Sequence, residues 1–399
     1  MNILFLTRSL PIHATGGMER HAELLIKGMA ELGHELTVIT TGHPGGKTQE
    51  SWDHIVINYL AGTTPGKYSK KWWHSSKDMA LKIFRQQNID IIYSMSAGAF
   101  ALMKMERMPP IVVGATGTAY GEMLTKFRQT FSWKKYPGII KNLYNWYHTK
   151  KLLPYADKII ACSDQVKTEL VTRFNVSDEK VSVVIPGIDT QRFNKFQNKK
   201  ESLKEKLNIN DKDITILFVS RLKKEKGIMF LLDGFKKISK SYPNLKLIIS
   251  GDGEEKKNID KFILTNKLSE NIKCIGNISY DEIPKIFSIA DIFAFPTLRN
   301  EGLPLVVLEG IAARKILLCS DIPQIKQGAA DYEASVFFHA NNREDFLGKF
   351  RDVIDNIDSF KKKTEVISCA VSNIDYHTMA ERTIKVLEEV VIETHPHNK

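Results

Sequence analysis

The stretch DIFAFPTLRNEGLPLVVLEGIAARK, residues 291–315, joins an apolar strand to an apolar helix through a short turn. In that turn Gly302 is free to take an unusual backbone conformation, and Pro304 suits the first position of a helix. We therefore expect the helix to begin near Leu303, with its unpaired amides at the carboxyl end of the strand. A buried strand that leads into a helix is the repeating unit of parallel α/β sheets.

Two glutamates bracket the apolar part of this stretch. Glu301 lies in the turn beside the free amides, and Glu309 follows the apolar run Leu305–Leu308. Removing a carboxylate from water is costly unless it accepts hydrogen bonds, and the vicinal hydroxyls of a ribose are suitable donors. The spacing leaves a second interpretation open, in which Glu301 is a cap residue favoured by the helix dipole and Glu309 is an exposed helix position.

The alternation of strands and helices continues along the whole chain. A first series of apolar runs covers residues 2–7, 35–40, 54–60, 89–95, 110–116, 157–163 and 181–187, with a helix at 18–34. A second series covers residues 214–220, 245–251, 272–278, 291–297, 315–321 and 334–340, and a helix at 376–393 follows it. The runs are continuous rather than alternating, which indicates strands covered on both faces in a doubly wound parallel sheet.

The polar segment 188–213 separates the two series and is the best candidate for a linker. A chain of 399 residues is also too long for one ordinary core. We predict two doubly wound, Rossmann-like α/β domains, residues 1–190 and 191–375, that face each other across a cleft. Ligands of such sheets bind at the carboxyl ends of the strands.

The composition indicates a soluble protein of a reducing compartment. Its apolar and charged fractions, 43% and 26%, are ordinary for a globular protein. The four cysteines are far apart and form no CxxC pair, which argues against a disulfide framework and against a zinc site. The first residues hold too few apolar side chains for a signal peptide, and no stretch is apolar enough to span a membrane. We expect a cytoplasmic protein.

Much of the net charge of +11 comes from residues 126–151. This segment, KFRQTFSWKKYPGIIKNLYNWYHTKK, contains seven lysines or arginines, seven aromatic residues and no acid. Such a composition suits a membrane surface with anionic lipids, which would make the chain a peripheral protein at the inner face of the cell membrane. The alternative is a pair of helices whose aromatic side chains are buried and whose lysines are solvated.

Other strand ends carry residues suited to anions. Gly16 and Gly17 precede helix 18–34, where a glycine backbone permits close approach and a helix N-terminus supplies free amides. Arg221 and Lys226 follow strand 214–220, and both side chains can bind a phosphate. Each loop also has an ordinary interpretation, as a flexible cap in the first case and a solvated basic loop in the second.

Gly251 and Gly253 stand at the end of strand 245–251. Lys256 occupies the place of the third glycine in a GxGxxG motif, which weakens a dinucleotide-binding interpretation. A tight turn from strand to helix is the simpler explanation of these two glycines.

Taken in order, several segments resemble the retaining glycosyltransferases of family 4, which have the GT-B architecture of two Rossmann-like domains. The segments are GGMERH, GHELTVIT, ADKIIACSDQVK, VIPGIDTQRF, SRLKKEKGIMFLLDGF, LIISGDG and ADIFAFPTLRNEGLPLVVLEGIA. The last contains the E-x7-E pattern of the family, as Glu301 and Glu309. The resemblance covers nearly the whole chain, and it implies that the last helix, about residues 376–399, packs back on the first domain.

The resemblance also implies roles for the candidate residues. Arg221 and Lys226 would bind the donor diphosphate and stabilise the charge of the leaving group. Glu301 would hold hydroxyls of the transferred sugar, and Glu309 would accept from the ribose hydroxyls. The remaining donor-binding positions are Gly16, Gly17, Gly251, Ile278, Gly302 and Leu303. The nucleotide sugar would be a co-substrate, no metal or other cofactor would take part, and attack on the same face would retain the anomeric configuration.

One departure from the family lies on the acceptor side. Many relatives carry a His-Gly pair where this chain has Thr116 and Gly117, and Ser94 and Ser96 replace histidines after the preceding strand. A hydroxyl donates a hydrogen bond but is no general acid or base near neutral pH. Either the leaving phosphate alone handles the proton, or the acceptor site is specialised, or activity is lost. We favour a specialised acceptor site.

The predicted function is transfer of a sugar from a nucleotide-diphosphate sugar, UDP- or GDP-linked, to a hydroxyl of a lipid-linked or cell-envelope glycan. Loops 60–77 and 116–150 would select the acceptor. The alternatives are a catalytically silent scaffold that binds nucleotide sugars, a nucleotide-sugar epimerase or hydrolase, and a basic nucleic-acid-binding protein. The sequence contains no recognisable nucleic-acid-binding module, so we expect no nucleic-acid partner.

Overall fold

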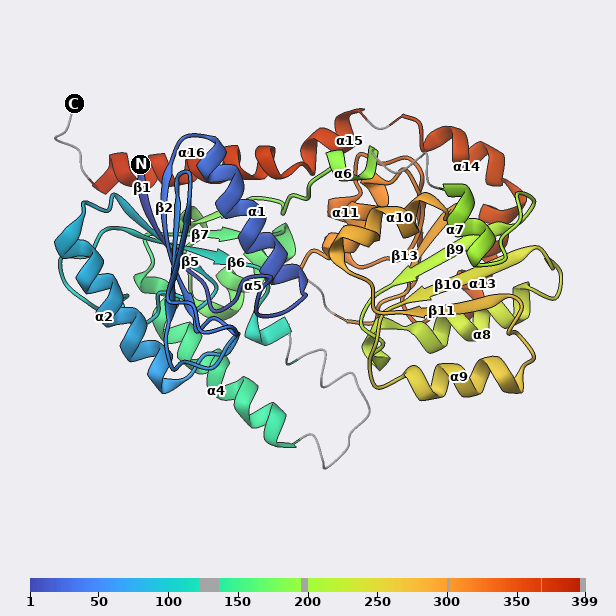
Figure 1. The fold of residues 1–399 in the computed structure, drawn as a ribbon, viewed down its shortest axis with the longest axis horizontal. Coiled ribbons are helices and arrows are strands. Elements are labelled where there is room, and N and C mark those ends of the chain that lie inside the picture. Colours follow the sequence, from blue (N-terminus) through green and yellow to red (C-terminus); the bar gives the residue numbers. More distant parts are fainter. Residues whose placement is uncertain (122, 124–135, 195–199, 300–301, 367, 395–399) are drawn as a thin grey trace. The chain divides into compact units, whose positions relative to one another are not determined.

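The computed structural model describes residues 1–121, 123, 136–194, 200–299, 302–366 and 368–394. The chain divides into two compact units. The first unit comprises Met1–Ile188, Glu301–Leu303 and Asp375–Lys399, and the second comprises Asp189–Asn300 and Pro304–Ile374 (Figure 1). Each unit is built around its own sheet.

The first unit contains an eight-stranded sheet in the order β3-β4-β2-β1-β5-β6-β7-β8. Its strands are β1 (Asn2–Leu6), β2 (Glu35–Thr41), β3 (Gln49–Trp52), β4 (Ile55–Leu60), β5 (Ile91–Met95), β6 (Ile111–Ala115), β7 (Lys158–Ala161) and β8 (Val181–Val183). All pairings are parallel except that of β3 with β4, which is antiparallel. The sequence did not reveal β3 because this strand at the sheet edge is polar and mostly exposed.

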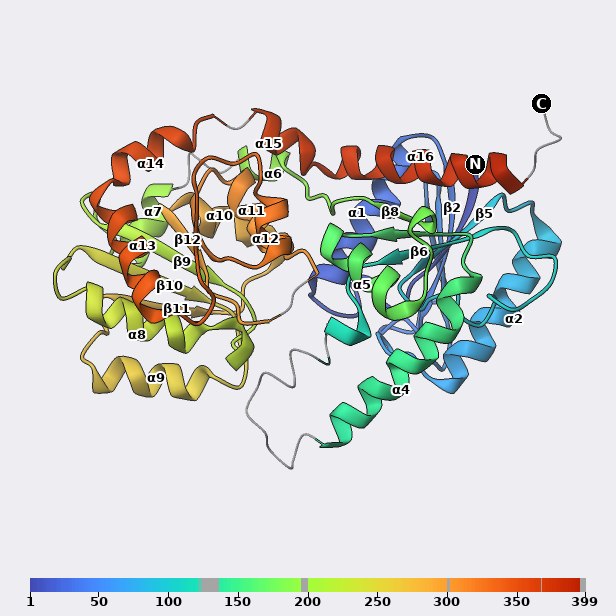
Figure 2. The same cartoon turned by 180° about the vertical axis from the view of Figure 1, so that it is seen from behind.

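Helices cover both faces of this sheet (Figures 1 and 2). They are α1 (Gly17–Glu31), α2 (Lys70–Gln86), α4 (Tyr136–Leu152), α5 (Asp164–Phe174) and α16 (Tyr376–Thr394). One apolar core joins the sheet to α1 and α16, and a second joins it to α2 and α5. Two separate cores explain why the strands read as continuous apolar runs.

The C-terminal helix α16 packs against α1. A Cβ atom added at Gly28 would lie 2.7 Å from the Cβ of Ala380, so the absence of a side chain at Gly28 lets the two helices approach closely. Just before α16, Asp375 forms a parallel bridge with Ile188. The last helix is therefore part of the first unit, although it follows the whole second unit in sequence.

The second unit contains a six-stranded sheet in the order β11-β10-β9-β12-β13-β14, with all pairings parallel. The strands are β9 (Ile214–Val219), β10 (Leu245–Ser250), β11 (Ile272–Gly276), β12 (Ile292–Phe295), β13 (Ile316–Ser320) and β14 (Ser335–Phe338). The strand order reverses between β9 and β12. Ligands of open parallel sheets bind at such a switch point, at the carboxyl ends of the strands.

The helices of the second unit are α6 (Gln191–Asn194), α7 (Lys200–Lys206), α8 (Ile228–Ile238), α9 (Lys256–Thr265), α10 (Ile283–Ser288), α11 (Leu305–Ala312), α12 (Pro323–Gly328), α13 (Arg343–Asp355), α14 (Ile357–Lys363) and α15 (Ser368–Asn373). Among the described residues of both units, no helix is long and apolar enough to cross a bilayer.

Two local expectations need correction. The segment 188–213, predicted as a linker, contains α6 and α7. The guanidinium of Arg192 lies 3.9 Å from the ring centre of Tyr280 and donates to its carbonyl at 3.0 Å, which fastens this segment to the second unit.

Helix α11 begins at Leu305, and Pro304 is its N-cap rather than its first residue, because the ψ angle of Pro304 is 114° and not helical.

Candidate functional site

In the second unit, the loop after β9 carries the two predicted phosphate-binding cations. Arg221 is exposed, and no hydrogen bond or ion pair of its side chain occurs among the described residues. Lys226 is 7% exposed, and its ammonium lies 5.5 Å from the centre of the Phe295 ring at the end of β12. The loop therefore exposes the guanidinium of Arg221 to solvent and holds the ammonium of Lys226 close to the strand ends.

The loop after β9 is tied to the loop after β12. The carbonyl of Glu225 accepts from the amide of Leu298 at 2.8 Å and from the hydroxyl of Thr297 at 3.3 Å. The carboxylate of Glu225 also forms an ion pair with Arg299 at 3.8 Å. Sequence reasoning missed the contacts of Glu225 with Thr297 and Arg299. Glu225 lies more than seventy residues before the other two in the chain, so the three form no local motif.

Glycines permit close contact between these strand ends. Gly227 has a φ of 74°, and a Cβ atom there would overlap the carbonyl oxygen of Pro296. Gly251 has a φ of 139°, and a Cβ atom there would overlap the carbonyl oxygen of Ser220. Both positions need glycine for conformation and for space. Gly251 was predicted to bind the donor. The structure shows that it packs against the backbone of Ser220, and its contact with a ligand stays a prediction.

The predicted base-binding position lies beside these loops. Ile278 is half-buried and lies two residues after the end of β11. The last residue of β11, Gly276, accepts from the amide of Gly251 at 2.8 Å. The backbone around Ile278 is thus joined by hydrogen bonding to the loop after β10, at the same edge of the sheet.

Glu309 is 5% exposed and lies in the middle of α11, between the buried residues Leu308 and Gly310. The alternative that it is an exposed helix position is therefore wrong. A carboxylate in such surroundings needs hydrogen-bond donors. Gly302 and Leu303 come directly before the N-cap of α11, with Leu303 buried. Glu301, the other glutamate of the predicted pair, lies outside the described residues.

In the first unit, Gly16 is the N-cap of α1 and Gly17 is its first residue, and both are exposed. A Cβ atom at Gly16 would overlap the carboxylate of Glu19, which is buried and accepts from the hydroxyl of Ser9 at 2.6 Å. The first turn of α1 is thus joined to the loop after β1, and a contact of its amides with a ligand stays a prediction.

A small pocket in the first unit brings His21 and Thr116 together. Its polar lining comes from α1, β5, the residues after β6 and β7, and α16, and consists of His21, Tyr93, Thr116, Cys162 and Thr383. Burial lowers the pKa of His21 to about 4, so its imidazole is neutral at physiological pH. Sequence reasoning did not predict that His21 lines a pocket. The signal that could have indicated its burial is its position before Leu24 and Leu25 on the apolar stripe of α1. Gly117, next to Thr116, is exposed.

The serines in the place of the family's histidines have a structural role. Ser94 is buried; its hydroxyl donates to the carbonyl of Ser96 at 2.9 Å and accepts from the amide of Ala99 at 2.8 Å. Ser96 has a φ of 53°, so this turn needs its local hydrogen bonds.

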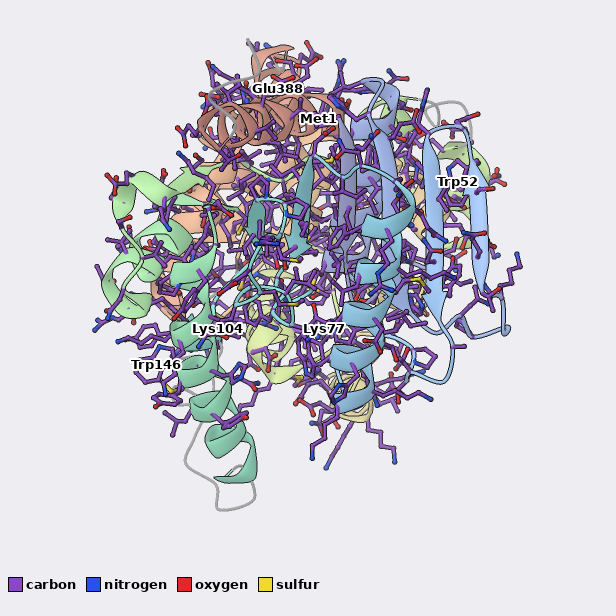
Figure 3. All side chains as sticks on the ribbon, turned by 90° about the vertical axis from the view of Figure 1, so that its left-hand side faces the viewer. Met1, Trp52, Lys77, Lys104, Trp146 and Glu388 are labelled. Carbon is purple, nitrogen blue, oxygen red and sulfur yellow. The ribbon has the colours of Figure 1, made fainter. Side chains whose placement is uncertain are left out.

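Part of the basic and aromatic segment 126–151 forms α4, while residues 126–135 lie outside the described residues. On α4, Tyr144 is 65% exposed and Tyr147 is 53% exposed. Trp146, which Figure 3 labels on α4, packs partly against the core, and the ammonium of Lys150 lies 5.3 Å from its ring centre. The two interpretations of this segment each describe one side of the helix: one side contacts the core, and the other presents tyrosines to solvent.

Within the part of the chain that the structure describes, no group of three or more His, Cys, Asp or Glu side chains is arranged to hold a metal ion.

Comparisons with known proteins place the chain in one family. The sequence model described as Glycosyltransferase Family 4 matches residues 15–192, and the one described as Glycosyl transferases group 1 matches residues 199–394. Alpha-monoglucosyldiacylglycerol synthase of Acholeplasma laidlawii is 28% identical over 342 residues, covering 79% of this chain and 80% of that protein. The phosphatidylinositol N-acetylglucosaminyltransferase GPI3 subunit of Saccharomyces cerevisiae is 20% identical over 386 residues, covering 94% of this chain and 80% of the relative.

Among solved structures, Anabaena HepE in complex with UDP-glucose superposes with a TM-score of 0.74 at 18% identity, covering 98% of this chain and 100% of that one. This likeness concerns the fold. The ordered motifs, the two parallel sheets and the two family matches agree, and the chain therefore belongs to glycosyltransferase family 4, the glycosyl transferases group 1, with the GT-B fold.

Proposed function

We propose that this glycosyltransferase binds a nucleotide-diphosphate sugar, UDP- or GDP-linked, at the carboxyl edge of the sheet in its second unit. The observation that carries the proposal is the contact between the loops after β9 and β12, where Lys226 lies against Phe295 and Glu225 is bonded to Leu298 and Arg299. Ribose hydroxyls would donate to the carboxylate of Glu309 on α11. The UDP-glucose complex of the structurally similar HepE supports a donor of this chemical class.

The other donor contacts follow from the loop geometry. Arg221 offers a guanidinium fork to the diphosphate, and Lys226 adds a positive charge near the same strand ends. The ties from Glu225 to the loop after β12 hold the phosphate-binding loop next to the segment that leads to Glu301. Glu301 and the amides of Gly302 and Leu303 would bind the sugar.

In the proposed reaction, the bond from the anomeric carbon to the donor phosphate breaks, and the acceptor oxygen attacks the same face of the sugar. Because the acceptor attacks the face from which the phosphate leaves, the anomeric configuration is retained. The acceptor proton passes to an oxygen of the leaving phosphate, and we propose that no metal takes part. Arg221 and Lys226 stabilise the negative charge that develops on the diphosphate. Thr116 orients the acceptor by hydrogen bonding, because its hydroxyl cannot act as a general base near neutral pH.

The acceptor in this proposal is a lipid or lipid-linked glycan at an anionic membrane surface. The exposed tyrosines of α4, with the lysines beside them, form a surface suited to lipid head groups. Two relatives from different organisms support a lipid acceptor, since their names refer to a glucosyldiacylglycerol and to phosphatidylinositol. We propose a peripheral location at the inner face of the cell membrane.

The test is a thermal-shift panel of UDP-, GDP-, ADP- and dTDP-sugars on the whole protein. A ligand at about 100 times its dissociation constant stabilises the folded state by about 2.7 kcal/mol. We expect a shift with one nucleotide, lost in Glu309→Ala and reduced in Glu309→Gln. The control is Glu388→Ala, which removes an exposed glutamate from α16. A folded protein that shifts with no nucleotide contradicts the donor site.

The second step of the test uses the nucleotide identified by the panel. Turnover of the donor in the presence of EDTA, with a product of the same anomeric configuration as the donor, supports a retaining and metal-independent transferase. The presence of Thr116 in place of histidine also favours a second candidate, a silent scaffold. Binding of the donor without transfer to any acceptor or to water would establish that candidate instead.

A further inference from the structure

At the carboxyl edge of the first unit's sheet, the loops after β1 and β4 are fastened to each other through Thr41. The hydroxyl of Thr41 donates to the carbonyl of Arg8 at 2.6 Å and accepts from the amide of Gly66 at 2.8 Å. The imidazole of His13 adds a contact from its Nε2 atom to the carbonyl of Thr41 at 3.3 Å. Because these bonds join two loops and β2, the backbone positions of Arg8 and of the loop that contains Gly66 are well defined.

The loop after β4 supplies an aromatic surface next to Arg8. The ring of Tyr68 stacks on that of Trp73, with centres 5.0 Å apart and planes at 21°. The phenol hydroxyl donates to the carbonyl of Met95 at 3.3 Å, at the end of β5. The guanidinium carbon of Arg8 lies 5.8 Å from the centre of the Tyr68 ring, within the range of a cation–π contact. Tyr68 is thus held on two sides and in turn supports Arg8.

Arg8 carries donors that the described part of the chain does not satisfy. Its Nε atom is buried and has no hydrogen-bond partner there. Arg8 as a whole is half-buried. The nearby carboxylate of Glu19 accepts from the hydroxyl of Ser9. A guanidinium that is partly removed from water without an anion is costly, so an anionic ligand would stabilise this arrangement.

The electrostatic surroundings of Arg8 also favour an anion. The segment 61–77 contains Lys67, Lys70, Lys71 and Lys77 and no acidic residue. In the described residues none of these lysines forms an ion pair with a carboxylate, and neither does Arg8. The ammonium of Lys71 lies over Gly62, in the same loop after β4. Arg8 thus contacts Tyr68 of a segment that is rich in lysine and free of acid, and its guanidinium fork suits the geometry of a phosphate group.

We propose that Arg8, supported by Tyr68 of the lysine-rich segment 61–77, binds the phosphate ester of an acceptor lipid. This inference rests on the proposed function, because it names the class of acceptor: a phospholipid or lipid phosphate rather than a neutral glycerolipid. The site is built from residues at the ligand-binding edge of the first unit's own sheet, whereas the proposed donor-phosphate residues Arg221 and Lys226 belong to the second unit. The Tyr68 and Trp73 rings would contact the apolar part of the lipid next to its phosphate.

The experiment measures binding to the whole protein by calorimetry. The probes are monomeric dioctanoyl phosphatidylglycerol, the neutral dioctanoylglycerol, inorganic phosphate, and the nucleotide identified by the donor panel. The variants are Arg8→Gln, Arg8→Lys and Arg85→Gln. Arg85 is an exposed arginine in the last turn of α2, while segment 61–69 precedes the first turn of the same helix. Arg85→Gln therefore removes the same charge away from the proposed site and is a matched control.

We expect the wild-type protein to bind the phospholipid at least about tenfold more tightly than the neutral lipid. Arg8→Gln should remove this preference, Arg8→Lys should retain part of it, and Arg85→Gln should leave it intact. The midpoint of thermal unfolding and the nucleotide affinity should be the same in all variants, and the unfolding midpoint shows that each is folded whatever the outcome of the donor panel. The lipid titration stands independently of the donor panel, so a failure of the donor site and a failure of this subsite are distinguishable.

Three results would overturn the proposal. Equal affinity for the charged and neutral lipids would show that no phosphate is recognised. Binding of inorganic phosphate as tight as that of the phospholipid would assign the site to free phosphate rather than to an acceptor. An equal loss in Arg8→Gln and Arg85→Gln would show only a diffuse effect of positive charge.

Discussion

At the scale of single residues, the surroundings of Glu309 decide between two interpretations of its position. In the sequence it is a glutamate inside an apolar run, and both a buried and an exposed position are consistent with that pattern. The structure buries it on α11, among Val307, Leu308 and Ile311. This burial excludes the interpretation of Glu309 as an exposed helix position, and its contact with the hydroxyls of a ribose stays a prediction.

His21 predicts a pH dependence of stability. Its pKa is about 4 in the folded state, below its ordinary value of 6.5, because burial disfavours the charged imidazole. Between pH 6.5 and 4 the unfolded chain binds a proton that the folded chain does not bind. The free energy of unfolding therefore falls as the pH is lowered through this range, by about 3 kcal/mol in total.

The measurement is urea unfolding at pH values from 7 to 4 for the wild type, His21→Leu and His21→Asn. Both variants should show a shallower loss of stability at low pH than the wild type. His74→Gln, which replaces an exposed histidine of α2, should follow the wild-type curve. Parallel curves for the wild type and both His21 variants would show that His21 does not contribute.

At the scale of elements, the seam between α1 and α16 completes the core of the first unit. Met379, Ala380, Leu387 and Val390 of α16 are buried there, while Glu388 lies on the exposed side of the helix (Figure 3). The final helix is thus a structural part of a core whose sheet precedes it by about two hundred residues.

Truncation of one side chain in this seam tests its contribution. Leu387→Ala removes a fully buried side chain and should lower the free energy of unfolding of the first unit by about 2–5 kcal/mol. The neighbouring change Glu388→Ala should alter it by less than about 0.5 kcal/mol. Chemical denaturation of both variants gives the comparison, and equal effects would mean that α16 does not pack against α1 in solution.

At the scale of the whole molecule, the net charge of +11 and the exposed tyrosines of α4 predict binding to anionic vesicles. Binding should weaken as the salt concentration rises from about 50 to about 500 mM, because salt screens exposed charges. The double change Tyr144→Ser and Tyr147→Ser should reduce binding further by removing the apolar contact.

Sedimentation with vesicles of stated anionic content measures this association. Leu264→Ser is the control, since Leu264 is an exposed apolar residue on α9 of the second unit. Absence of binding at low salt would contradict the membrane proposal. An equal reduction by Leu264→Ser would show that α4 is not the contact surface.

By itself, the sequence determined the elements that depend on local patterns. Continuous apolar runs predicted the parallel strands, and their predicted bounds agree with the structure to within a few residues, because a strand buried on both faces must be apolar throughout. The predicted domain boundary at residue 190 and the observed change of unit after Ile188 fall in the same segment. The ordered loop motifs, with Glu309 in the last of them, indicated the family.

Only the tertiary structure decided the contacts between distant strand ends. The bond from Leu298 to Glu225, the pocket shared by His21 and Thr116, and the arrangement of Arg8 on Tyr68 join residues that share no local pattern. A parallel sheet brings the carboxyl ends of strands together in an order that differs from their order in the chain. For that physical reason a sequence can mark each loop as a candidate, while the sheet topology decides which loops meet.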